Sequence, residues 1–122
     1  MIKSFLLIGL GGGIGSMCRY WASLFLLNKS FPVATLLVNI IGSFIIGLVA
    51  AYALKSEWFA ANCKLFFATG MCGGFTTFSA FSLENLQMLQ QGKYLWSLVY
   101  ITASIVLSLT ATFLGYKLLL LN

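Results

Sequence analysis

The arrangement of apolar residues constrains this chain more than any other feature of its sequence. Four long apolar runs occupy residues 4–27, 33–54, 65–91 and 94–119. Each run is long enough to cross a bilayer as a helix, which takes roughly 20 residues. Because the runs are continuous and do not alternate apolar with polar residues, they predict membrane helices rather than the strands of a membrane barrel.

The overall composition supports a bilayer as the solvent for these helices. Of 122 residues, 61% are hydrophobic and only 7% are charged, whereas about a quarter of the residues in a soluble domain are charged. A soluble fold of this length has too much surface for its volume to hide that much apolar side chain. The breaks between runs are short: Asn28-Lys29-Ser30, Lys55-Ser56-Glu57 and Gln90-Gln91-Gly92-Lys93. We therefore expect an all-α membrane protein with a single, multi-pass domain of four transmembrane helices over residues 1–122.

The seven basic residues, which contribute to a net charge of +5, are spread singly along the chain. Single Lys and Arg residues beside apolar runs are typical of membrane proteins, whereas a nucleic-acid-binding protein clusters them. On the two sides of the expected membrane they divide almost evenly, as Lys3, Lys55, Lys64 and Lys117 against Lys29, Lys93 and Arg19. This balance indicates no fixed orientation and permits insertion both ways up, and hence an antiparallel dimer.

Several classes of function are not expected from the residue inventory. The chain has no histidine, and its three cysteines stand alone in apolar sequence, so neither a zinc site nor a redox centre is predicted. Since no nucleophile is paired with a base, the chain is not expected to be an enzyme. The acidic residues are Glu57 and Glu84, so the first, second and fourth runs hold no carboxylate for proton-coupled transport.

The third run is too long for one straight crossing and is interrupted near its middle, within residues 70–82. Gly73 and Gly74 are followed by Thr76 and Thr77, and adjacent glycines with β-branched residues disfavour a continuous helix. A broken membrane helix exposes backbone carbonyls, which are tolerated only where something coordinates them. Carbonyl oxygens near the bilayer midplane suit a hard cation such as sodium. A glycine-lined packing kink is an equally good interpretation of the pattern.

The other polar residues within the runs are mainly hydrogen-bond donors. Asn39 is the lone amide of the second run, and it predicts either a bond between helices or an amide donor for an anion. Tyr100, Ser104 and Ser108 recur every four residues and would form a hydroxyl stripe on one face of the fourth helix. This inventory of donors favours an anion over a cation or a proton.

Three further features each have a packing interpretation and a functional one. Phe78 and Phe81 lie three apart, so they either pack together or offer the positive edges of their rings to an anion. Small residues spaced by four over 9–16 predict a flat face for close helix packing, and they lack the spacing of a phosphate loop. Arg19 either extends its charge to the membrane surface or provides a positive charge at the mouth of an anion path.

Three segments of the sequence, at residues 11–20, 37–43 and 70–82, resemble the CrcB/Fluc family of fluoride ion channels. The resemblance covers essentially the whole chain, and the segment Cys-Gly-Gly-Phe-Thr-Thr-Phe-Ser from Cys72 is its most specific part. It implies a dual-topology, antiparallel homodimer in the lipid of a bacterial inner (plasma) membrane. Two separate pores of that dimer would export toxic cytoplasmic fluoride by passive electrodiffusion, with no nucleic-acid partner.

The same resemblance implies roles for individual residues. The backbone carbonyls of Gly73 and Thr76 would hold a central structural sodium ion, and Arg19 would lie in an aqueous vestibule. The pore residues that contact fluoride would be Asn39, Phe78, Phe81, Tyr100, Ser104 and Ser108. Ala80 stands where relatives often have threonine. The alternatives are a small four-helix, proton-coupled exporter of the multidrug type, which needs a buried glutamate in its first helix, and a non-conducting helper subunit.

Overall fold

The computed structural model describes residues 1–27 and 30–122, and the described part is helical with no β-strand. Asn28 and Lys29, which belong to the first expected polar break, lie outside the described residues. The elements in chain order are α1 (Ile2–Phe25), α2 (Val33–Lys55), α3 (Glu57–Asn62), η1 (Leu65–Cys72), α4 (Gly73–Phe75), α5 (Phe78–Gln90) and α6 (Tyr94–Leu120).

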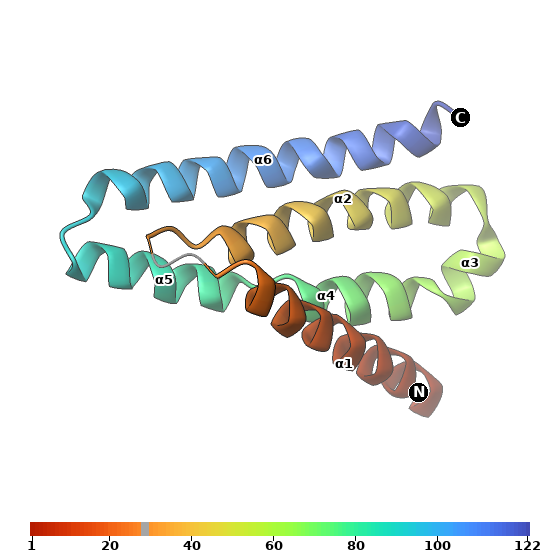
Figure 1. Cartoon of the computed structure of the whole chain (residues 1–122). Helices are drawn as coiled ribbons and strands as arrows, with labels where there is room; N and C mark the ends of the chain where they lie inside the picture. Colours follow the sequence, from red (N-terminus) through yellow and green to blue (C-terminus); the bar gives the residue numbers. More distant parts are fainter. Residues whose placement is uncertain (28–29) are drawn as a thin grey trace.

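Helix α2, the stretch from η1 to α5 and helix α6 lie alongside one another, and α1 crosses them at an angle (Figure 1). Helices α2 and α6 run side by side in the same direction. The stretch from η1 to α5, which comes between them in the sequence, runs in the opposite direction. By length and composition, α2 and α6 are each able to cross a membrane. Their bounds agree within one residue with the expected runs at 33–54 and 94–119.

Specific local signals set where these helices begin and end. The turn between α5 and α6 closes with Gly92 at a φ of 73°, a conformation that glycine adopts without a steric penalty. Its amide donates to the Leu89 carbonyl, and the Lys93 amide donates to the Met88 carbonyl, which completes a Schellman motif. Helix α3 was not expected from the sequence, and Ser56 caps its first turn by accepting a hydrogen bond from the Phe59 amide at 3.2 Å.

Glycines bring the helix backbones into direct contact at two interfaces. A Cβ atom added at Gly15 of α1 would lie 2.2 Å from the Met71 carbonyl oxygen of η1. A Cβ atom added at Gly47 of α2 would lie 2.2 Å from the Thr112 carbonyl oxygen of α6. By contrast, no atom of the described residues lies within 4 Å of a Cβ at Gly13, so only part of the predicted small-residue face is used in the described part of the chain. These contacts fix how far apart the helices lie and how they are rotated.

The third apolar run does not form one helix. It starts as a π-helix, η1, continues through α4, and is interrupted at Thr76 and Thr77, whose φ/ψ values of −80°/158° and −153°/119° are extended. Helix α5 then begins at Phe78, and the Thr77 hydroxyl caps it by accepting the Ala80 amide at 3.1 Å. The interruption lies within the expected segment 70–82, and its depth in a membrane stays a prediction.

Candidate functional site

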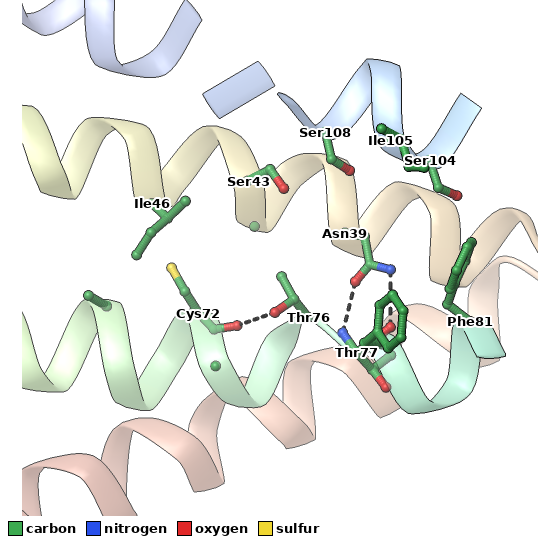
Figure 2. Close-up of a pocket in the computed structure, with 14 residues that line it drawn as sticks. Asn39, Ser43, Ile46, Cys72, Thr76, Thr77, Phe81, Ser104, Ile105 and Ser108 are labelled. Atoms are coloured by element: carbon green, nitrogen blue, oxygen red, sulfur yellow. Dashed lines mark hydrogen bonds between the residues drawn. The ribbon is translucent and has the colours of Figure 1, made fainter. Parts of the chain in front are cut away.

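The interruption at Thr77 is held by the side chain of Asn39 on α2. The Thr77 amide donates to Asn39 Oδ1 at 2.8 Å, and Asn39 Nδ2 donates to the Thr77 carbonyl at 3.1 Å (Figure 2). This pair of bonds fixes the amide orientation, because a flipped side chain would place donor against donor and acceptor against acceptor. The second hydrogen on Nδ2 is not used by either bond. Asn39 therefore holds the backbone of the break and keeps one N–H available.

These bonds release two backbone carbonyls from their helical partners. In a continuous helix the Gly73 carbonyl would accept from the Thr77 amide, but that amide donates to Asn39. The Thr76 carbonyl would accept from the Ala80 amide, but that amide donates to the Thr77 hydroxyl. The two carbonyls predicted to bind sodium are thus among those that lose their helical donors at the break. The carbonyls of Gly74 and Phe75 precede the same break, and that of Gly74 accepts the Ser16 hydroxyl at 3.5 Å. Carbonyl oxygens are suitable ligands for a hard cation, so the residues present fit a sodium ion.

A cavity of about 440 Å³ lies between α2, α6 and the interrupted third segment (Figure 2). Its walls combine apolar residues with a few polar ones, as is usual for a site that binds a small ligand. Among the residues with predicted roles, its lining includes Asn39, Gly73, Thr76, Phe78, Phe81, Ser104 and Ser108. The structure therefore brings together seven predicted site residues that are separated by up to 69 positions in the sequence (108 − 39).

The hydroxyl group of Ser104 has no partner within the described chain. The side chain is only 8% exposed, and its Oγ is buried without a hydrogen bond among the described residues. Leaving a buried hydroxyl unpaired costs on the order of 1–3 kcal/mol. Serine and threonine hydroxyls in membrane helices often donate to the carbonyl four residues earlier, as the Thr112 hydroxyl does to the Ser108 carbonyl at 3.1 Å. The Ser104 hydroxyl makes no such bond. An unpaired buried donor at a cavity wall is typical of a ligand site.

Phe78 and Phe81 both border the cavity but differ in exposure. Their ring centroids are 5.3 Å apart, and the Phe81 ring lies 5.0 Å from that of Tyr100. Phe81 is half-buried, whereas Phe78 is 78% exposed in the single chain. A phenylalanine this exposed beside a cavity is expected to be covered by lipid or by another chain.

Tyr100 lies next to the cavity but is not part of its lining. It is fully buried, and its hydroxyl donates to Glu84 Oε2 at 2.7 Å. The other carboxylate oxygen of Glu84 accepts the Thr35 hydroxyl at 2.6 Å. The predicted stripe on α6 is therefore divided, since the Tyr100 hydroxyl is engaged by a carboxylate while Ser104 and Ser108 face the cavity. A second cavity, of about 300 Å³, borders Glu84, Thr35 and Lys93 at the α5–α6 turn.

Arg19 is not brought to either cavity. It lies half-buried on α1 and is not among the lining residues of either cavity. The structure of one chain therefore places it apart from the other predicted site residues. Its role in a vestibule stays a prediction.

Three polar residues of the site were not singled out from the sequence. Thr35 and Glu84 form the hydroxyl–carboxylate cluster, and Ser43 lines the first cavity. A signal for two of them was present, because Thr35, Asn39 and Ser43 are spaced by four and so share one face of α2. This stripe has the same spacing as Tyr100, Ser104 and Ser108 on α6.

The fold and the cavity define a helical protein with membrane-capable helices and a small, donor-lined site beside an interrupted helix. A family model described as "CrcB-like protein, Camphor Resistance (CrcB)" matches residues 6–116 of this chain. The chain belongs to this CrcB-like family.

Individual relatives support the assignment over nearly the full length. The "Fluoride-specific ion channel FluC" of Azobacteroides pseudotrichonymphae genomovar. CFP2 is 46% identical over 119 residues, which cover 95% of each chain. The protein of the same description from Flavobacterium psychrophilum is 45% identical over 118 residues, covering 93% of this chain and 94% of its own. The one from Pyrococcus abyssi is 41% identical over 121 residues, covering 94% of each.

Proposed function

We propose that this protein is a fluoride-specific ion channel and not an enzyme. Its relatives carry that description over nearly their whole length, so the function does not depend on a single shared segment. The observation in the chain itself that carries the proposal is the unpaired, buried Ser104 hydroxyl on the cavity wall. Fluoride is small and strongly hydrated, so a pore must replace its water with closely set hydrogen-bond donors.

The cavity has the donors that this replacement needs and lacks fixed charges that would hold the ion too tightly. Asn39 has an N–H that its bonds to Thr77 do not use, and Ser104 and Ser108 add hydroxyl groups from α6. No Lys, Arg, Asp or Glu is among the lining residues of this cavity. Neutral donors stabilise an anion and still release it, which conduction requires. The edges of the Phe78 and Phe81 rings would add weak positive potential.

We further infer that the chain crosses a bacterial inner membrane four times. Besides α2 and α6, helix α1 has 24 residues, and the stretch from η1 to α5 covers residues 65–90. At 1.5 Å per residue each reaches roughly 35 Å or more, which exceeds a hydrocarbon core of about 30 Å. The outer side of α1 supports this reading, because it exposes large apolar side chains along its length, including Phe5, Leu10, Met17 and Trp21. Lipid would cover this side in a membrane.

The functional unit that we propose is an antiparallel, dual-topology homodimer with two pores. The carbonyls that we assign to sodium at the break are those of Gly73 and Thr76, and a sodium ion takes more oxygen ligands than two. A second copy related by two-fold symmetry would supply the same two carbonyls. Gly73 fits this role because a Cβ at this position would meet no atom within 4 Å, so the space beside it is open. Sodium would then join the two interrupted helices structurally.

A proton-coupled exporter of the multidrug type is less well supported by the same geometry. Such an exporter needs a carboxylate that is free to exchange protons with the substrate path. Both oxygens of Glu84 accept hydrogen bonds, from Thr35 and Tyr100, and Glu84 does not line the first cavity. Helix α1 contains no acidic residue.

The experiment that tests the channel is fluoride efflux from liposomes that contain the purified protein. A fluoride electrode reads the release after the membrane potential is collapsed with an ionophore, and chloride-loaded liposomes serve as the control. Fast fluoride release without chloride release is the expected result. Release that requires an imposed proton gradient would support the exporter, and no release from folded, monodisperse protein would contradict both.

A further inference from the structure

We propose that Ser43 is an additional anion ligand that completes the donor set of the pore on the α2 side. The inference rests on the proposed channel function and assigns a role to a residue outside the predicted site. Ser43 lies one helical turn beyond Asn39, so both side chains are on the same face of α2. It lines the cavity of about 440 Å³ together with Ser104 and Ser108 of α6.

The Ser43 hydroxyl is free to serve a ligand. It makes no hydrogen bond to any residue in the described part of the chain. Figure 2 shows Ser43 beside the same cavity as Ser104 and Ser108 of α6. Two nearby threonine hydroxyls are satisfied locally: Thr76 at the break donates to the Cys72 carbonyl at 2.8 Å, and Thr112 of α6 donates to the Ser108 carbonyl at 3.1 Å. Ser43 could bond the Asn39 carbonyl in the same way and does not. Like the Ser104 hydroxyl it has no partner among the described residues, although Ser43 is half-buried and Ser104 is buried.

The position of Ser43 also determines from how many helices an anion in the cavity would receive hydroxyl donors. Helices α2 and α6 run in the same direction, and residues spaced by four on each give two polar stripes beside one cavity. With Ser104 and Ser108 alone, an anion at this depth would receive hydroxyl donors from one helix only. Ser43 adds a donor from the other helix, next to the Asn39 amide. A desolvated anion is bound more strongly when donors surround it than when they lie on one side.

The test compares two substitutions of equal shape, Ser43→Thr and Ser43→Val. Threonine keeps the hydroxyl and valine replaces it with a methyl group, so any effect of added bulk is the same in both. Since a hydrogen bond to a charged group is stronger than a neutral one, we expect Ser43→Val to lower fluoride efflux by about tenfold. Ser43→Thr should stay within about twofold of the parent protein.

The matched control is Thr112→Val, which removes a hydroxyl from α6 that is bonded to its own helix and does not line the cavity. It should conduct like the parent. Equal fluoride efflux of Ser43→Thr and Ser43→Val, whether high or low, would overturn the assignment, because the hydroxyl would then not matter. If the valine variant is not monodisperse on gel filtration, Ser43→Ala removes the hydroxyl without adding bulk and decides the question. Failure of the channel proposal itself is distinguishable, since the parent protein would then release no fluoride.

Discussion

At the scale of single residues, the site depends on which polar groups are already bonded and which are not. Asn39 uses one donor and one acceptor on Thr77, and the Tyr100 hydroxyl is engaged by Glu84. The hydroxyls of Ser43 and Ser104 have no partner in the described chain. Polar residues of this site therefore differ in function. Those with a hydrogen-bond partner stabilise the fold, and those without one can bind an ion.

The double role of Asn39 leads to a prediction for Asn39→Asp. Aspartate can still accept the Thr77 amide, but it loses the donation to the Thr77 carbonyl and places two oxygens close together. It also puts negative charge on the wall of the proposed anion path. We expect fluoride efflux to fall by at least about tenfold, since a like charge in this site disfavours anion entry.

The control for this change is Asn62→Asp in α3. Asn62 also donates from Nδ2 to a backbone carbonyl, that of Trp58 at 2.8 Å, but it does not line the cavity. Fluoride efflux through Asn62→Asp should match that of the parent. Equal loss in both variants would show that the lost hydrogen bond or the added charge acts through the fold in general, and Asn39 would then not be a pore residue.

Phe81 makes a second prediction at this scale. Its ring borders the cavity and packs against Tyr100 at 5.0 Å, so Phe81→Ile removes an aromatic edge and leaves an apolar side chain. Since aromatic contacts are worth roughly 0.5–1.5 kcal/mol, we expect up to about tenfold lower fluoride efflux with an unchanged oligomer on gel filtration. Phe113→Ile on the exposed side of α6 is the control. A Phe81→Ile variant that conducts like the parent would remove this residue from the pore.

At the scale of elements, the separation of α2 and α6 sets the width of the cavity. Gly47 and Gly115 are positions where these two helices touch through backbone atoms. The hydroxyls of Ser43 and Ser108 lie within a turn or two of these contacts. A change in the separation of the helices must therefore change the distances between the donors.

Gly47→Ala tests this dependence. In a helix, alanine is intrinsically more stable than glycine by about 1 kcal/mol. A loss of stability in this variant must therefore come from packing. The added Cβ would lie 2.2 Å from the Thr112 carbonyl oxygen and must push α6 away, at a cost of about 1–3 kcal/mol. We expect a lower midpoint in a thermal melt and reduced fluoride efflux. Gly13→Ala, where a Cβ meets no atom within 4 Å, should melt no lower than the parent.

At the scale of the whole molecule, one chain is an incomplete version of the proposed channel. Its break offers the Gly73 and Thr76 carbonyls, and Phe78 is exposed beside the cavity. A second copy in the opposite orientation would add two carbonyls to the sodium site and cover this phenylalanine. The exposed apolar residues of α1 and α6 are available for lipid or for the partner.

A sodium-dependence experiment tests this assembly. We predict that protein purified and reconstituted with N-methylglucamine in place of sodium shows much lower fluoride efflux, and that added sodium restores it. Native mass spectrometry of the sodium-containing sample should give twice the mass of one chain. Fluoride efflux that is indifferent to sodium would argue against a structural cation at Gly73 and Thr76, even if the dimer is intact.

The helical class and the bounds of the long helices could be predicted from local sequence patterns. Apolar runs of membrane length and the Gly-Gly and Thr-Thr pairs are local properties, and they predicted α2, α6 and the segment in which the third helix is interrupted. The family resemblance pointed to fluoride and to seven of the residues that line the cavity. Helix α3 was missed, because six residues between two apolar runs have no periodicity to recognise.

Which polar groups are available to an ion depends on contacts between helices and could not be predicted from the sequence. A spacing of four places Tyr100, Ser104 and Ser108 on one face of their helix, but it does not say what lies opposite each of them. The contact with α5 gives Tyr100 a carboxylate partner, whereas Ser104 meets a cavity. Likewise, the pairing of Asn39 with Thr77 depends on the distance and rotation between α2 and the break. These are set by backbone contacts between residues far apart in the sequence, and no local pattern encodes them.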